Sequence, residues 1–193
     1  MPKNFKFYVD HALTFRCQLQ SHRCESNNNN GRRCGNKSVI GTPVCWRHLL
    51  KHYHVRIKES QYGKGLFAMD TTKDDNAVIF KRNDTIVQYE GEILNRNELN
   101  NRYGRRTAPY AVQQADDRYI DSACHRGVGS LINHAPEAQS NCRFSYGRNN
   151  NIQVKATKNI RNNRELFLNY NKGVRRNEQR YLFNEEGVNH TTT

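Results

Sequence analysis

The sequence has no long hydrophobic run. No apolar stretch approaches 18 residues, the length that marks a membrane-spanning helix, so no transmembrane segment is expected. The first residues, MPKNFKFY, lack the apolar core and the cleavage site of a secretory signal peptide. We therefore expect an intracellular protein of a reducing compartment, where clustered cysteines hold metal more often than they form disulfides.

Acidic residues are few. The chain has 18 aspartates and glutamates against 31 lysines and arginines, which gives a formal net charge of +13. This excess indicates an anionic partner, most commonly nucleic acid, although a generally solvated basic surface has the same composition. A free histone tail is itself basic, so the charge fits a substrate presented on DNA. Hydrophobic residues make up only 35%, but ten tyrosines and eight phenylalanines indicate a folded chain with many polar loops.

Clustered cysteines mark an N-terminal module of about residues 14–50. Three thiolates and one imidazole in this module form a common tetrahedral set for structural zinc. The set consists of Cys24, Cys34, Cys45 and His48. Cys17 is a fifth candidate that can replace Cys24, and the alternative is a group of unrelated reduced cysteines. A module this small buries little apolar surface, so metal would supply much of its folding free energy.

The zinc module also carries many cations, which can contact nucleic acid or a nucleosome or only solvate the module. They are Arg16, Arg23, Arg32, Arg33, Lys37 and Arg47.

A second module is expected over residues 55–172, followed by a C-terminal segment, 173–193. Its short apolar segments predict strands at 55–58, 77–80, 85–94, 119–121, 142–146, 152–156 and 165–170. Asn95, followed three residues later by Glu98, forms a capping box and predicts a short helix over 96–103. Strands without alternating long helices exclude a doubly wound sheet and predict a mainly β fold with short helices.

Four short motifs follow one another in the second module. Gly63-Lys64-Gly65 lies between predicted strands, where glycines let the backbone approach a bound small molecule. Tyr89-Glu90-Gly91, Ile132-Asn133-His134 and the segment 165–170, which ends in Tyr170, come after it. Each motif alone is commonly structural, but their joint order over about 110 residues is hard to explain by chance.

This order resembles the SET-domain protein-lysine methyltransferases, and most closely their compact stand-alone members, including those of large DNA viruses. The resemblance implies a β-clip fold of small sheets with a knotted C-terminal segment. It implies S-adenosyl-L-methionine as the cofactor and a lysine of a histone or another chromatin protein as the substrate. It places the protein in the nucleus or on viral or host chromatin. The cofactor-binding positions that it implies are Lys64, Gly65, Leu66, Asn133 and His134, with Tyr103 a weaker candidate.

The resemblance also assigns the catalytic positions. Tyr170 and Tyr89 are expected to position the amine and the methyl group, while Phe144 and Leu168 line the lysine channel. Neither Phe144 nor Leu168 has a hydroxyl, which favours di- or trimethylation. The sequence indicates no oligomeric state.

Three departures from the family pattern are evident. Ala135 replaces the usual serine, and the stretch to Asn141 is two residues longer. No cysteine follows Cys142, so a zinc-binding cap after the domain is absent, and Tyr181 and Phe183 are expected to close the channel instead. Two alternatives stay open: a catalytically silent SET-like module that binds chromatin or nucleic acid, and a zinc module that reads nucleic acid on a scaffold.

Overall fold

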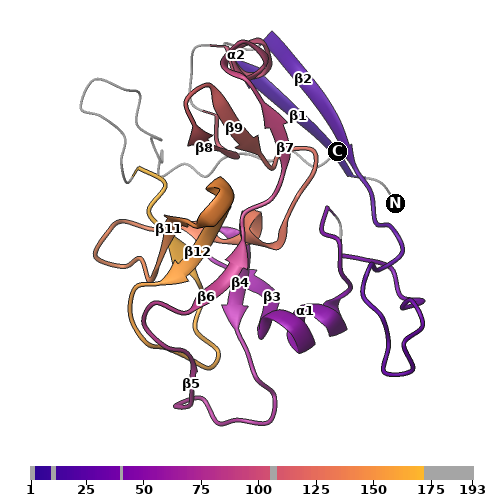
Figure 1. The fold of residues 1–193 in the computed structure, drawn as a ribbon, viewed down its shortest axis with the longest axis vertical. Coiled ribbons are helices and arrows are strands. Elements are labelled where there is room, and N and C mark those ends of the chain that lie inside the picture. Colours follow the sequence, from indigo (N-terminus) through magenta and orange to yellow (C-terminus); the bar gives the residue numbers. More distant parts are fainter. Residues whose placement is uncertain (1–2, 10–11, 40, 105–107, 172–193) are drawn as a thin grey trace.

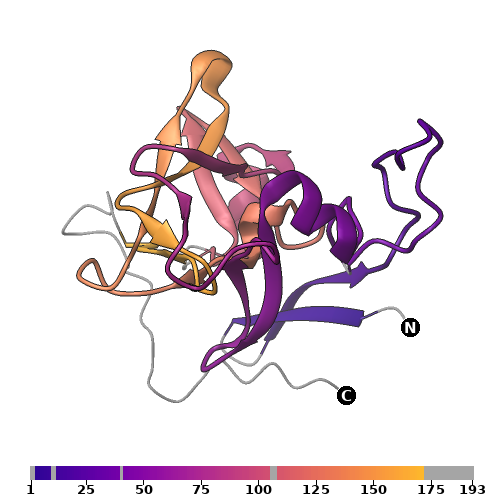
Figure 2. The same ribbon diagram turned by 90° about the horizontal axis from the view of Figure 1, so that it is seen from below.

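A computed structural model describes residues 3–9, 12–39, 41–104 and 108–171. The chain begins with a hairpin of β1 (Lys3–Val9) and β2 (Ala12–Leu19), continues through cysteine-containing loops and enters helix α1 (Trp46–Tyr53). Small sheets follow, and they surround the middle of the molecule (Figure 1). In Figure 2 the loops before α1 project to one side of this body. No helix among the described residues has the length and apolarity needed to cross a membrane.

Four further sheets build the second module. The pairs are β3 (Val55–Ser60) with β4 (Gly63–Ala68), and β5 (Val78–Phe80) with β13 (Ile160–Arg161). The three-stranded sheet has the order β7 (Glu92–Leu94), β9 (Arg118–Asp121), β8 (Ala111–Ala115). The five-stranded sheet has the order β10 (Asn133–His134), β14 (Phe167–Leu168), β11 (Cys142–Tyr146), β12 (Ile152–Ala156), β6 (Thr85–Gln88). Helix α2 (Arg96–Tyr103) and the 3-10 helices η1 (Val128–Leu131) and η2 (Arg148–Asn150) complete the elements.

The C-terminal strand β14 lies between β10 and β11, which are neighbours in sequence but not in the sheet. It pairs in parallel with both. The Asn141 side chain fixes this insertion: its amide donates to the carbonyl of Glu165 at 2.7 Å and accepts from the backbone N–H of Phe167 at 2.8 Å. The predicted mainly β fold with a knotted C-terminal segment is therefore confirmed.

One hydrophobic core joins the cysteine loops to the second module. Cys24, Cys45 and Leu49 belong to the same buried cluster as Val55 and Leu66. Because the core is continuous, order in the loops supports the strands on which the second module is built. The boundary expected near residue 50 stays a prediction.

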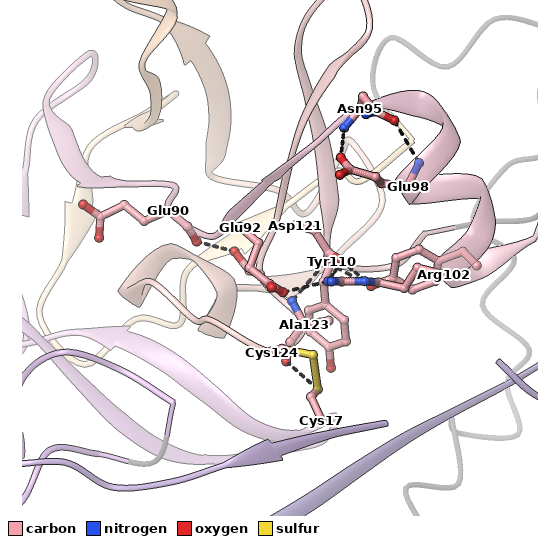
Figure 3. A network of polar contacts seen from close by, with 12 residues as sticks. Cys17, Glu90, Glu92, Asn95, Glu98, Arg102, Tyr110, Asp121, Ala123 and Cys124 are labelled. Carbon is pink, nitrogen blue, oxygen red and sulfur yellow. Dashed lines mark hydrogen bonds and ion pairs between the residues drawn. A yellow bond between two sulfur atoms is a disulfide. The ribbon is translucent and has the colours of Figure 1, made fainter. Parts of the chain in front are cut away.

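The N-terminal hairpin packs against α2 and the three-stranded sheet. Phe15 meets the Tyr103 ring edge-on, with ring centroids 5.0 Å apart, and a disulfide joins Cys17 of β2 to Cys124 just after β9. Figure 3 shows this disulfide beside a polar network around Asp121, which is fully buried and accepts from Arg102 at 2.7 Å. The sequence did not predict this cysteine pair, and it corrects one alternative: Cys17 is not a fifth metal ligand.

Several predicted elements coincide with the observed ones. The two strands at 142–146 and 152–156 and the helix at 96–103 have the predicted bounds. Asn95 and Glu98 form the expected capping box, in which each side chain accepts a hydrogen bond from the other residue's backbone N–H.

Two predicted strands differ from the structure. The stretch 85–94 breaks into β6 and β7 at Gly91, where a β-carbon would lie 2.4 Å from the Asp121 carbonyl oxygen. The stretch 165–170 contains only the two-residue strand β14, because the residues around it bond to side chains instead. The hairpin β1–β2, helix α1 and strand β8 were not predicted.

The disulfide gives a prediction for stability. It closes a loop of 107 positions, so chain-entropy arguments give about 4 kcal/mol of stabilisation. We expect the phosphine reductant TCEP to lower the free energy of unfolding of the oxidised protein by up to this amount, measured in guanidinium titrations. Cys17→Ser should have the lower value and no response to the reductant. Equal stabilities of oxidised and reduced wild type, with the bond verified by mass spectrometry, would contradict the prediction.

Candidate functional site

Three of the sequence motifs meet at Gly65. Asn133 donates from its side-chain amide to the carboxylate of Glu165 at 2.9 Å and to the carbonyl of Lys64 at 3.1 Å. The other carboxylate oxygen of Glu165 accepts from the Ser60 hydroxyl at 2.9 Å. A β-carbon on Gly65 would lie 2.1 Å from that carboxylate and 2.9 Å from the Asn133 amide, so only glycine permits this packing.

The predicted cofactor-binding residues are not equally accessible. Asn133 and His134 are half-buried, and Lys64 is exposed with its ammonium paired to Glu59. Gly65 is buried beneath the Asn133–Glu165 bond, and Leu66 has no exposed surface. Direct cofactor contact therefore fits Lys64, Asn133 and His134, while Gly65 and Leu66 form the support underneath.

Tyr103 does not have the predicted role. Its side chain is fully buried, and its hydroxyl donates to the carboxylate of Asp121 at 2.9 Å. With no accessible surface it cannot touch a bound cofactor, so its assignment to the cofactor site is corrected. It joins α2 to β9 as part of the network of Figure 3, which also draws Arg102 on the same carboxylate.

His134 and Tyr170 lie together at the end of the knotted segment. The backbone N–H of Tyr170 donates to Nδ1 of His134 at 3.0 Å, and the two ring centroids are 5.3 Å apart. Burial lowers the pKa of His134, which keeps the imidazole neutral with Nδ1 as an acceptor. The Tyr170 hydroxyl donates to the carbonyl of Ile132, the residue before Asn133.

Tyr89 lies against Gly129, which belongs to the segment that leads into Asn133 and His134. Its ring would contact a β-carbon on Gly129 at 3.3 Å, and its hydroxyl donates to the carbonyl of Tyr110 at 2.7 Å. Burial raises the pKa of Tyr89, so the phenol stays protonated. The structure thus brings both predicted tyrosines against the stretch from Gly129 to Ile132.

The two predicted channel residues differ in their surroundings. Phe144 is half-buried and meets Tyr89 edge-on, with centroids 5.3 Å apart. Leu168 is 1% exposed and lies in the core, where it offers almost no surface to a substrate. Tyr181 and Phe183 lie outside the described residues.

Sequence reasoning missed two residues of the site. Tyr110 accepts the Tyr89 hydroxyl, and no motif marked it. Glu165 binds Asn133 over Gly65. The sequence could have indicated this residue, because Glu165 is the first residue of the motif that ends in Tyr170.

A second site lies in the N-terminal loops. The ligand atoms of Cys24, Cys34, Cys45 and His48 all lie within 4.8 Å of one another, and all four residues are buried. His48 presents Nδ1 at 3.3 Å from the sulfurs of both Cys24 and Cys45. Burial opposes a thiolate at Cys45, but hydrogen bonds from His48 and Asn36 outweigh it and lower the pKa to about 6. These distances and donors fit a tetrahedral zinc ion, so the predicted four-residue cluster is confirmed.

Two arginines tie the loops of this cluster together. Arg23 precedes one ligand and donates to the carbonyls of Cys34 and Arg33 at 3.0 and 2.9 Å. Arg33 precedes another and donates to the carbonyls of Cys24 and Arg23, both at 3.2 Å. The reciprocal arrangement fixes the spacing of two ligands, so these cations serve the fold rather than a partner.

The inserted strand β14 and the meeting of the four motifs define a SET-type fold. A comparison with protein families matches residues 63–171 to the SET domain. The match covers more than half of the chain, which therefore belongs to the SET-domain family. A comparison with curated proteins finds no match.

Solved structures of a histone-modifying class resemble the chain at low similarity. A crystal structure of polycomb repressive complex 2 from Chaetomium thermophilum is 26% identical over 60% of this chain and 15% of that chain, with a TM-score of 0.49. An active polycomb repressive complex 2 in the stimulated state is 25% identical over 66% of this chain and 16% of that chain, with a TM-score of 0.49. The chain thus matches about 15% of the length of the solved chains.

Gly65 provides a test of the cofactor site. Gly65→Ala places a methyl group against Glu165 and Asn133, so we expect binding of S-adenosyl-L-methionine to weaken at least about 100-fold. Isothermal titration calorimetry measures this, with circular dichroism to verify the fold. The control is Gly35→Ala, since a β-carbon on Gly35 meets nothing within 4 Å. Unchanged affinity in a folded Gly65→Ala protein would place the cofactor elsewhere.

The arginine pair predicts an effect on metal affinity. Arg23→Lys and Arg33→Lys keep the charge but lose the two-pronged bonds, so each should weaken zinc binding by about 10-fold or more. Competition with a chromophoric chelator reports the affinity. Arg32→Lys, on an exposed neighbour whose hydrogen bonds to Asn28 are made by its backbone, should have wild-type affinity. Equal affinities for all three variants would argue against a role in ordering the ligands.

Proposed function

We propose that the protein is an S-adenosyl-L-methionine-dependent protein-lysine N-methyltransferase. The observation that carries the proposal is the pair of tyrosines, Tyr89 and Tyr170, whose hydroxyls donate to main-chain carbonyls and whose side chains adjoin the segment that leads into Asn133 and His134. The proposed cofactor surface consists of Lys64, Asn133 and His134 above Gly65. The family match supports methyl transfer as the activity.

The residues suit the demands of the reaction. A lysine ammonium has a pKa of about 10.4 and cannot attack a methyl group until it loses a proton. The proposed lysine channel, with Tyr89 and Phe144 as walls, would exclude water and disfavour the charged amine. S-adenosyl-L-methionine, when bound, supplies a methyl group attached to a positively charged sulfur.

Orientation is the second demand. The attacking nitrogen must lie in line with the bond to the methyl group, and such alignment contributes several kcal/mol. Tyr170 is fixed at its backbone by His134 and at its hydroxyl by Ile132, so its ring and oxygen have defined positions. Because burial raises the pKa of Tyr89, that hydroxyl acts as a hydrogen-bonding group and not as a base.

Charge supports a basic protein substrate such as a histone. Residues 90–121, which include β7 to β9 and follow Tyr89 directly, contain six carboxylates and five arginines, although the whole chain carries +13. This part of the chain is therefore nearly neutral, with a net charge of −1, and repels a lysine-rich peptide less than the rest does. A nucleosome is the proposed form of the substrate, which places the protein on chromatin. The compact viral type stays a prediction from the sequence.

The channel residues suggest the degree of methylation. Phe144 has no hydroxyl to hold a water molecule or to restrict the amine, so we propose di- or trimethylation. The cysteine cluster is proposed to hold a structural zinc ion, since its four ligands leave no open coordination position.

A methyltransferase assay tests the proposal. The full chain is incubated with labelled S-adenosyl-L-methionine and with nucleosomes or free histones. We expect label on lysine, and a loss of about 100-fold in rate for Tyr170→Phe and Tyr89→Phe because the amine is no longer oriented. Tyr119→Phe, a change of the same kind on β9, should keep the wild-type rate.

Two results would contradict the assignment. Cofactor binding without transfer to any nucleosomal or histone lysine would support a silent binding module instead. Equal loss in all three tyrosine variants would indicate damage to the fold rather than to the site.

A further inference from the structure

The described residues are uneven in charge along the chain. Residues 138–164 contain no carboxylate, and their six cations are Arg143, Arg148, Lys155, Lys158, Arg161 and Arg164. This run accounts for nearly half of the net charge of +13. A positively charged stretch of this density is the electrostatic pattern of a surface that contacts a polyanion.

Three of these cations line one cavity, which we call the basic pocket. Lys158, Arg161 and Arg164 surround a volume of about 480 Å³ between the loop before β14 and strand β4. Phe67 and Phe167 contribute aromatic surface, and amide side chains complete the lining. Cations together with amides and aromatic rings are the groups that bind phosphates and bases in proteins.

The cations of the basic pocket form few interactions within the protein. Lys158, Arg161 and Arg164 are exposed, and none of the ion pairs among the described residues involves any cation of 138–164. Arg161 donates only to an amide oxygen, that of Asn76, at 3.3 Å. These charges are therefore available to an external anion.

The one carboxylate in the lining does not neutralise them. Glu165 is turned to the cofactor side, where its two oxygens accept from Ser60 and Asn133. Two nearby carboxylates have partners of their own: Asp75 accepts from the Asn163 amide, and Asp84, in the turn of Lys81 and Arg82, accepts from the backbone N–H of Lys81.

More cations adjoin the basic pocket. The backbone N–H of Arg82 donates to the side chain of Asn159, which lines the pocket, so the turn that carries Lys81 and Arg82 lies beside it. Lys58 donates to Asn163 and lies over the Phe67 ring at 5.0 Å. The basic surface thus extends beyond the volume that one small anion would fill.

The N-terminal loops are the competing surface. There, Arg23 and Arg33 donate to main-chain carbonyls around the cysteine cluster and are occupied by the fold. The exposed cations of these loops whose side chains form no hydrogen bond or ion pair with another described residue are Arg32, Lys37 and Arg47. The two surfaces thus offer equal sets of three cations for comparison.

We propose that the basic pocket and the adjoining cations bind the phosphate backbone of nucleic acid. The inference goes beyond the methyltransferase proposal and does not depend on it, because the binding needs neither cofactor nor lysine substrate. The extent of the surface favours a polymer over a free nucleotide, since several cations outside the pocket would otherwise have no ligand. Binding through phosphates should be independent of base sequence and strongly dependent on salt.

The test is fluorescence anisotropy with a labelled 30-base-pair DNA duplex at several potassium chloride concentrations. The variant Lys158→Gln/Arg161→Gln/Arg164→Gln should bind at least about 10-fold more weakly. Its plot of log affinity against log salt should become shallower by about 2 to 3, close to 0.9 for each lost phosphate contact. The matched control, Arg32→Gln/Lys37→Gln/Arg47→Gln, removes the same charge from the N-terminal loops and should lose less than threefold.

Each result decides the question. Equal losses of DNA affinity in the two variants would mean that only the net charge of the protein matters. A loss of affinity confined to the control would mean that the N-terminal loops bind the DNA. Either outcome overturns the proposal. If a mononucleotide bound at concentrations at which the duplex does not bind, the pocket would be a site for free nucleotides. This outcome would also overturn the proposal. Thermal melting verifies that both variants fold, and failure of methyl transfer would leave the DNA result unaffected.

Discussion

The insertion of β14 between β10 and β11 is the constraint on which the proposed active site depends. Asn133 and His134 lie on β10, Phe144 lies on β11, and Tyr170 follows β14, so the inserted strand sets the distances among them. Two hydrogen bonds of the buried Asn141 side chain hold the strand in place. Without this side chain the Phe167 N–H and the Glu165 carbonyl would lose their partners, at a cost of about 1–3 kcal/mol for each group, which makes the position intolerant of apolar replacements.

The same insertion explains the crowding at Gly65. Strand β14 brings Glu165 over β4, and the Asn133–Glu165 hydrogen bond then covers the glycine. The site is therefore preformed. The Glu165 carboxylate accepts hydrogen bonds from the Asn133 amide and from the Ser60 hydroxyl. The continuous core adds a second support, because Cys24 and Cys45 pack in the same cluster as Leu66, beneath Gly65. Order in these loops and order in β4 therefore depend on one shared core.

Local patterns predicted part of this structure. The capping box of Asn95 and Glu98 predicted the start of α2, and short apolar segments predicted β11 and β12, because these signals act within a few residues. The order of the sequence motifs identified Tyr89 and Tyr170 as candidate site residues without any structural information. The short extent of β14 and the disulfide partner of Cys17 were missed because both depend on residues far apart in sequence. Tyr103 was misassigned because the sequence does not show that Asp121 would bury its hydroxyl.

The net charge of the whole chain does not by itself predict which partners the protein binds. A chain with +13 would repel a basic peptide if its charge were evenly spread. The charges are unevenly distributed instead: residues 90–121, which follow Tyr89, are nearly neutral, while three cations of 138–164 line the basic pocket. Interactions between exposed charges fade beyond about 8 Å at physiological salt, so each surface acts on what is close to it. A basic substrate and a polyanion can therefore approach one small protein at the same time, without either cancelling the other.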